Sequence, residues 1–258
     1  MNTGLFLQTV LGLLLLLIPA GALYWLERKM LPSFAVSVAR MVVQLLVLCL
    51  LVWALIHVDS PWLLIAWLVA MAVYGGWIVL KRCRVKVGRL LPAVSAGLFV
   101  GTALTGLWIL TLALSVRVFE ARWFVPVTAL LMGHAMVMLI RGLNAYLTAL
   151  KTDEQQYEFL RGNGQSHFKA LKPFLRRSLL AVVSPTIANL SVSCLTSMPL
   201  LLGGILLGGL SPVSAFVLML HMTAGCIAAS VIALAVTLFL TDRSLFDKFG
   251  AMTFLSEK

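Results

Sequence analysis

The sequence predicts an all-α protein, a polytopic transmembrane helical bundle of about seven spans. Of its 258 residues, 61% are hydrophobic and only 11% are charged, whereas soluble domains are roughly 45–50% apolar and about 25% charged. The chain therefore has too few polar side chains to cover a surface in water. Its apolar residues also occur in runs of about 20, the length that crosses a bilayer. We expect a multi-pass protein of the cell (inner) membrane, with residues 1–258 forming one transmembrane domain.

Seven such apolar runs follow one another along the chain. They lie at residues 4–26, 37–56, 61–80, 92–116, 123–141, 178–208 and 214–240. The run at 178–208 is long and contains Pro185, Pro199 and several glycines. Proline and glycine at membrane depth require neighbours or a cavity to satisfy the freed backbone groups. This run therefore predicts either one kinked helix or two segments.

The unequal distribution of Lys and Arg between loops predicts the orientation, because cytoplasmic loops carry an excess of both. With the N-terminus outside, the cytoplasmic side receives Arg28, Lys29, Lys81, Arg82, Arg84, Lys86, Arg89, the basic residues from Arg141 to Arg177, Arg243, Lys248 and Lys258. The outside receives only Arg117 and Arg122. We therefore expect a cytoplasmic C-terminus. Anionic lipid accounts for the net charge of +11, so no nucleic acid is expected as a partner.

One predicted cytoplasmic segment, residues 142–177, is longer than a turn. Apolar residues at helical spacing predict that it first continues the fifth span, and the Gly-Asn-Gly at 162–164 predicts a break. The short amphipathic helix that follows carries Phe168, Leu171 and Phe174 beside basic residues. From the residues alone, this helix either lies on lipid headgroups or docks a cytoplasmic partner.

Polar side chains within the spans predict faces that turn toward protein or a cavity rather than lipid. The candidates for a cavity or substrate contact are Arg40, Gln44, His134, Asn189, Ser193 and His221. Hydrogen bonding between helices without substrate contact is the alternative for each. Four further residues, Met136, Met198, Met219 and Met222, are either soft metal ligands or packing residues only. The residues alone leave the metal ligands unknown.

Motifs for nucleotide binding or catalysis are absent from the sequence. It contains no GxxxxGK[ST] phosphate loop, no HExxH and no GxSxG, and its four cysteines show no CxxC spacing. Gly97 with Gly101, and Gly204 with Gly208, form GxxxG pairs that predict close helix packing. We therefore expect neither an enzyme nor a bound cofactor, and transport energised by a separate subunit.

A series of different short motifs extends along nearly the whole chain, in a particular order and at particular spacings. They are Ala39-Arg40 with Gln44-Leu45, Val58-Asp59, Trp77, Lys81-Arg82, Gly133-His134-Ala135-Met136, Gly164, Ser184-Pro185-Thr186, Ser197-Met198-Pro199, Gly204, Gly209-Leu210-Ser211-Pro212 and Ala215. In this series the chain resembles the FetB (YbbM) family of small ABC-transporter permeases, whose plant relatives are implicated in aluminium tolerance.

The resemblance implies a permease that forms a homodimer, pairs with a separate ABC ATPase that binds the ATP, and exports a metal ion such as iron. It assigns coupling with the ATPase to Glu158, Gly164, Phe168, Leu171 and Phe174. The family's intramembrane D-S-A-K-T is replaced here by Ala188-Asn189-Leu190-Ser191-Val192, which lacks both charges. A different small solute, or a non-transporting scaffold or assembly role, therefore remains an alternative.

Overall fold

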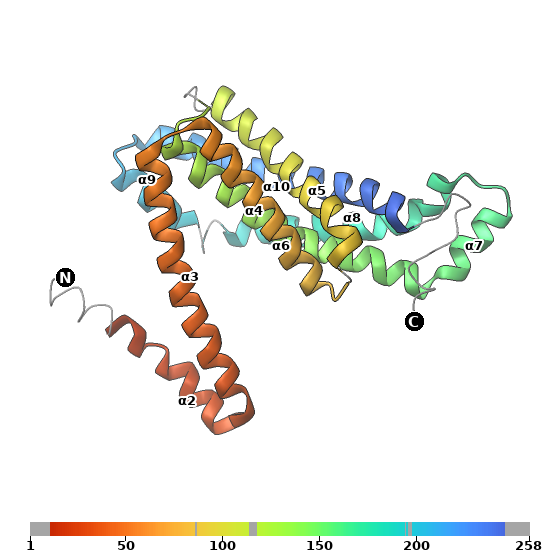
Figure 1. Ribbon diagram of the computed structural model, residues 1–258, viewed down its shortest axis with the longest axis horizontal. Coiled ribbons are helices and arrows are strands. Elements are labelled where there is room, and N and C mark those ends of the chain that lie inside the picture. Colours follow the sequence, from red (N-terminus) through yellow and green to blue (C-terminus); the bar gives the residue numbers. More distant parts are fainter. Residues whose placement is uncertain (1–10, 86, 114–117, 194, 196–197, 246–258) are drawn as a thin grey trace. The chain divides into compact units, whose positions relative to one another are not determined.

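The computed structural model describes residues 11–85, 87–113, 118–193, 195 and 198–245. These residues are almost entirely helical and include no strand (Figure 1), which confirms the predicted all-α class. The chain divides into two compact units, Met1–Val58 and Asp59–Lys258. That the two act as one permease domain stays a prediction.

The first unit contains two apolar helices. Helix α2 (Leu17–Leu26) is followed by the 3-10 turn η1 (Arg28–Met30) and by α3 (Leu31–Val58). The described part of the first predicted span forms a short apolar helix, Leu11–Leu26, and residues 4–10 lie outside the described residues. The second predicted span, residues 37–56, lies within a longer helical stretch, Arg28–Val58. This stretch is long and apolar enough to cross a membrane.

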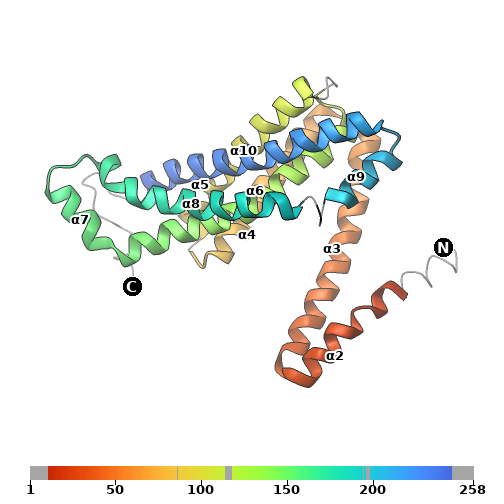
Figure 2. The ribbon, with the colours of Figure 1, turned by 180° about the vertical axis from the view of Figure 1, so that it is seen from behind.

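The second unit is a helical bundle built around α10. Its elements are α4 (Pro61–Arg82), α5 (Val87–Trp108), the π-helical turn η2 (Ile109–Ala113), α6 (Ala121–Thr152), α7 (Glu154–Gly162), α8 (His167–Ser193), α9 (Met198–Leu207) and α10 (Pro212–Leu245). Helix α10 packs along α5 and α6, α4 packs on α5, and α8 packs on α6. Helices α7 and α9 lie at opposite ends of this unit (Figures 1 and 2).

Close packing of α5 on α10 depends on two glycines. A Cβ on Gly97 would lie 2.7 Å from the carbonyl oxygen of Ala233, and a Cβ on Gly101 would lie 2.7 Å from that of Ala229. Only residues without a side chain allow two helix backbones this close. The packing role predicted for this GxxxG pair is confirmed, whereas a Cβ on Gly204 would meet nothing within 4 Å among the described residues.

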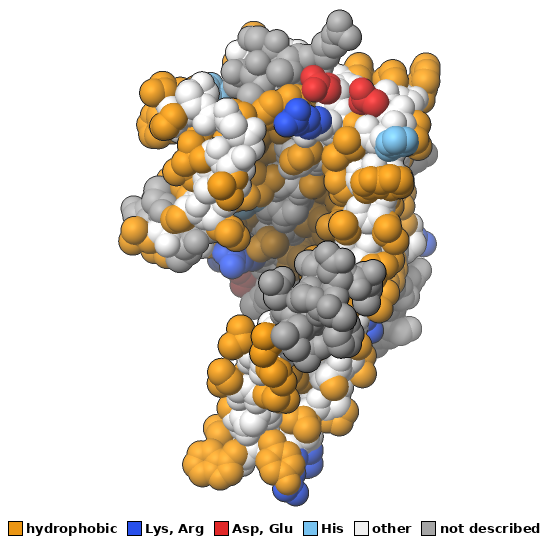
Figure 3. Space-filling view, turned by 90° about the vertical axis from the view of Figure 1, so that its left-hand side faces the viewer, with side chains coloured by type: hydrophobic (Ala, Val, Ile, Leu, Met, Phe, Trp, Pro, Cys, Tyr) orange, Lys and Arg blue, Asp and Glu red, His pale blue; other side chains and the backbone are white. Residues whose placement is uncertain are grey.

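Five helical stretches are long and apolar enough to cross a membrane, counted over the described residues. They are Arg28–Val58, Pro61–Arg82, Gly88–Leu112, Ala121–Thr152 and Pro212–Leu245. They match five of the seven predicted runs, and the total of seven spans and the orientation stay predictions. Hydrophobic side chains predominate on the face in Figure 3, and Trp62 and Phe216 are 81% and 64% exposed. Such exposure is expected when lipid is the solvent.

The predicted run at 178–208 forms two helices, since α8 ends at Ser193 and α9 begins at Met198. A separate short helix before this run was the wrong expectation, because α8 begins at His167 and continues through Pro173 and Pro185. Its packing explains the continuity. Ser178 donates a hydrogen bond of 2.8 Å to the carbonyl oxygen of Gly142 on α6, so contacts with a neighbouring helix outweigh the local breaking signal of the prolines.

Helix α6 receives its N-terminal cap from a distant part of the sequence. The Asp59 carboxylate accepts a hydrogen bond of 2.8 Å from the backbone N–H of Ala121, the first residue of α6. Asp59 has a φ of 41°, in the left-handed region that Asp adopts more readily than most residues. This contact places the beginning of α6 beside the loop that precedes α4, and the long α6 confirms the predicted continuation of the fifth span.

Cys83, directly after α4, is expected to react slowly with alkylating reagents. Burial raises the pKa of its thiol to about 11, and Sγ lies 3.7 Å from the carbonyl oxygen of Ile140 as a hydrogen-bond donor. Because the thiolate is the reactive form, alkylation at pH 8 should be roughly a hundredfold slower than for an ordinary thiol. Iodoacetamide kinetics on a chain with Ala at the other cysteine positions measures this. Denaturation in detergent should restore the ordinary rate, and equal rates before and after denaturation would contradict the burial.

Candidate functional site

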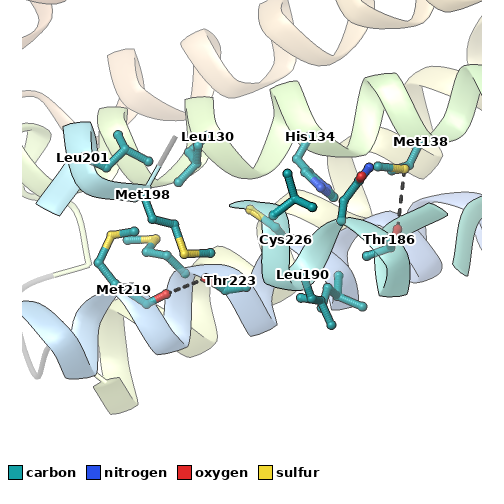
Figure 4. Close-up of a pocket in the computed structure, with 14 residues that line it drawn as sticks. Leu130, His134, Met138, Thr186, Leu190, Met198, Leu201, Met219, Thr223 and Cys226 are labelled. Carbon is teal, nitrogen blue, oxygen red and sulfur yellow. Dashed lines mark hydrogen bonds between the residues drawn. The ribbon is translucent and has the colours of Figure 1, made fainter. Parts of the chain in front are cut away.

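A cavity of about 350 Å³ opens between α6, α8, α9 and α10 (Figure 4). Its lining residues are Leu130, His134, Met138, Thr186, Asn189, Leu190, Val192, Met198, Leu201, Met219, Met222, Thr223, Cys226 and Ile227. Helix α10 contacts α6, α8 and α9, and α8 also packs on α6. The cavity is the place where polar and sulfur-containing side chains of the spans come together.

Sulfur atoms dominate the chemistry of this cavity. Met219, Met222 and Cys226 are buried and lie three and four residues apart on α10, so they share one helix face. Met198 of α9 is directed toward α10 (Figure 4). The fourth thioether, Met138 of α6, has its sulfur 3.6 Å from the hydroxyl of Thr186.

His134 is the one imidazole among the described residues of the cavity lining, and a hydrogen-bond chain fixes its ring. Ser230 donates its only hydroxyl proton to the carbonyl oxygen of Cys226 over 2.7 Å. The Ser230 oxygen therefore accepts from Nδ1–H of His134, which lies 3.0 Å away. In the neutral ring this assigns the lone pair to Nε2.

The cavity lining that the structure describes contains no Asp, Glu, Lys or Arg side chain. Over the same described residues, no three or more His, Cys, Asp or Glu side chains gather in a way that suits a metal ion. A site built on carboxylates, which hard metal ions prefer, is therefore not formed by these residues.

The structure brings together some of the predicted cavity residues and separates others. His134 and Asn189 line the cavity, while His221 lines another one with Trp108 and donates through Nδ1 to the carbonyl oxygen of Val217 over 2.7 Å. The Ser193 side chain lies outside the described residues. Arg40 and Gln44 are exposed on α3, in the other unit.

One of the four methionines takes the packing alternative, and several cavity residues were not expected from the sequence. The Met136 sulfur lies 2.9 Å from where a Cβ on Gly75 would be, so this residue packs on α4. The residues not expected at the site are Met138, Thr186, Cys226 and Ser230. The spacing of Cys226 from Met222 was the available signal, since residues four apart share a helix face.

The predicted coupling residues occupy a helical elbow, which consists of α7, the turn at 163–166 and the first turns of α8. Glu158, Gly164 and Phe168 are exposed, and Gly164 makes the turn with a φ of 79°, which favours glycine. Leu171 and Phe174 are buried, 2% and 0% exposed. In this conformation they hold α8 on the bundle instead of facing a partner.

A polar latch ties the elbow to the end of α10. The Tyr157 hydroxyl lies 2.8 Å from Nδ1 of His167, and Nε2 of His167 lies 2.9 Å from the Asp242 carboxylate. Burial raises the pKa of Tyr157, so its hydroxyl keeps its proton and donates to Nδ1. Nε2–H of His167 then donates to Asp242. Tyr157, His167 and Asp242 thus connect α7, α8 and α10. A separate ion pair joins Arg177 of α8 to Asp153, the residue before α7.

The chain has long apolar helices, exposes hydrophobic side chains, and packs two of its helices closely at glycines. These features define a multi-pass helical membrane protein. The chain belongs to the family described as Uncharacterised protein family (UPF0014), whose model matches residues 6–246. The predicted resemblance is thereby confirmed.

Three relatives illustrate the family. The chain is 27% identical to "UPF0014 membrane protein STAR2" of Oryza sativa subsp. japonica, over 73% of this chain and 65% of that protein. It is 24% identical to "Protein ALUMINUM SENSITIVE 3" of Arabidopsis thaliana, over 82% and 77%. It is 23% identical to "Probable iron export permease protein FetB" of Escherichia coli, over 82% and 80%. The aligned part thus spans just under two thirds of the rice protein. No solved structure matches the chain.

Proposed function

We propose that this chain is the permease subunit of an ABC transporter, which exports a metal ion with energy from ATP hydrolysed in a separate ATPase subunit. The carrying observation is that the elbow continues directly into α8 and is latched to α10, which are two of the four helices that line the cavity. The printed name of the Escherichia coli relative makes iron the first metal to test. We expect a homodimer of this chain in the complex.

The elbow offers a surface suited to a protein partner. Phe159 and Phe168 are 69% and 71% exposed, although they lie beyond the predicted spans. Phe159 lies on α7 and Phe168 on α8, so both helices of the elbow expose an aromatic side chain. Exposed aromatic side chains are typical of protein contact sites. Lys169 and Lys172 are exposed on the same helix as Phe168 and add positive charge, which favours a partner with an acidic rim.

Movement of the elbow has a direct mechanical path to the cavity. Helix α8 runs from His167 beside the latch to Thr186 and Asn189 at the cavity. Helix α10 runs from Asp242 to Cys226, roughly 24 Å at the rise of an α-helix. Because helices transmit displacement as stiff elements, closure of an ATPase dimer under the elbow would shift both cavity walls.

Changing both exposed aromatics to aspartate is expected to uncouple the partner. In the complex with an ATPase encoded beside this gene, Phe159→Asp with Phe168→Asp should lower permease-stimulated ATP hydrolysis at least tenfold, because two charges replace the apolar contact. Phe168→Leu is the matched control and should keep most of the stimulation. Full stimulation by the folded double variant would contradict the docking surface.

Flux into vesicles separates this proposal from its alternatives. Inside-out vesicles that contain the permease and its ATPase should accumulate iron only with ATP. A scaffold or assembly protein would move no solute under these conditions. Uptake of a small solute that is not a metal ion, with no metal ion moved, would retain the ABC permease and reject the proposed cargo.

A further inference from the structure

We propose that the cavity binds a soft monovalent metal ion, of the class of copper(I) and silver(I), through the sulfurs of Met198, Met219, Met222 and Cys226 and Nε2 of His134. The inference rests on the proposed function only for the fate of the ion, as cargo. Binding itself depends on the residues of one chain.

The donor atoms decide the class of ion. Thioether and thiol sulfurs select soft ions such as copper(I), whereas carboxylate and carbonyl oxygens suit hard ions. The described lining supplies four thioethers and one thiol but no carboxylate. Iron(III) and aluminium(III) would therefore find few of the ligands they prefer.

The absence of charged side chains from the described cavity lining also favours a monovalent ion. Moving an ion from water into a cavity of low dielectric costs free energy that rises steeply with its charge. The described lining offers no acidic side chain to offset a charge of two or three. A single positive charge that polarizable sulfur atoms share is the least costly cation in such a place.

His134 has the surroundings of a metal ligand. Imidazoles that bind metals usually donate the other ring N–H to a neighbouring acceptor, which fixes the tautomer and the orientation of the ring. Nδ1–H of His134 donates to Ser230, whose own proton is held by the Cys226 carbonyl. This arrangement leaves the lone pair of Nε2 for a metal ion, and His134 and Cys226 line the same cavity (Figure 4).

Helix spacing places the sulfur ligands on two sides of the cavity. Met219, Met222 and Cys226 line the α10 wall, and Met198 approaches from α9. Met198 lies directly after the break between α8 and α9. A shift of α9 would therefore add or remove a ligand without unfolding α10, which suits an ion that must be released.

Silver(I) binding to the purified full-length chain, without any ATPase, tests the site. Cys49, Cys83 and Cys194 are first changed to alanine, so that thiols outside the cavity bind no silver. Metal content and competition with a soft-metal chelator should show one tightly bound ion per chain. The triple change of Met198, Met219 and Met222 to leucine should weaken binding at least a hundredfold, and His134→Gln about tenfold.

Met136→Leu is the matched control, because this methionine packs on Gly75 of α4, outside the cavity lining. It should leave the affinity for silver unchanged. Leucine replaces methionine with nearly the same volume, so folding should be preserved, and circular dichroism with gel filtration verifies this. Equal silver affinity of the triple variant and the parent, or tighter binding of iron(II) than of silver(I), would overturn the proposal.

The outcomes for the two proposals are separable. Silver binding that depends on the methionines, together with no pairing to any ATPase, would retain the metal site and reject the transporter. ATP-driven iron flux that is unaffected by the triple variant would retain the transporter and reject the soft-metal site.

Discussion

Replacing Gly97 by leucine is expected to lower the thermal midpoint of the folded chain by about 10 °C. A Cβ at this position would lie 2.1 Å from the Thr237 hydroxyl oxygen and 2.7 Å from the Ala233 carbonyl oxygen. The backbone contact cannot be relieved by a rotamer change, so α5 and α10 must separate. Overpacking of this kind costs roughly 3 kcal/mol, which corresponds to about 10 °C for a protein of this size.

Thermal unfolding in detergent, followed by the loss of monodisperse protein, measures this effect. Gly133→Leu is the matched control, because a Cβ on Gly133 would meet nothing within 4 Å among the described residues. It should shift the midpoint by no more than a few degrees. Equal midpoints of the two variants would contradict the close approach of α5 and α10.

Removal of the latch is expected to release the elbow from the bundle. In His167→Ala, the contacts of the imidazole with both Tyr157 and Asp242 are lost. Backbone amides of residues 154–166 should then exchange with solvent at least tenfold faster, because a pair of hydrogen bonds that includes a charged group contributes about 1.5–3 kcal/mol. Stimulation of the ATPase should fall in parallel, since the elbow no longer moves together with α10.

A double-mutant cycle checks that the effect passes through the latch. Asp242→Asn and His167→Ala together should weaken the elbow little more than His167→Ala alone, because both changes remove the same contact. Tyr157→Phe removes one hydroxyl only and should have a smaller effect. Strictly additive changes in exchange, or protection unchanged in His167→Ala, would show that the elbow is held by other contacts.

Local patterns were sufficient for much of the helical architecture. The all-α class followed from apolar runs and scarce charge, and the break at 162–164 is confirmed by the positive φ of Gly164. The Gly97 and Gly101 pair was also correctly assigned to packing. Each of these features depends on residues that are near one another in the sequence.

The cavity and the latch could be predicted only in part. His134 and Asn189 were among the cavity candidates, yet nothing local indicated that Met138 of α6 would join Met219 of α10. The latch joins residues 10 and 75 positions apart in the sequence. Such partners are selected by how the helices cross, and a one-dimensional pattern does not contain the crossing geometry.

The sequence by itself determined that hydrocarbon surrounds much of this chain, because helices that satisfy their own backbone groups are the structures that long apolar runs form in lipid. The tertiary structure alone decided that α8 continues through two prolines, that Leu171 and Phe174 are buried, and that sulfur atoms of three helices face one cavity. These features depend on which helix faces pack together. In a bundle whose side chains are apolar on nearly every face, packing shape makes that choice, since hydrophobicity does not distinguish one face from another.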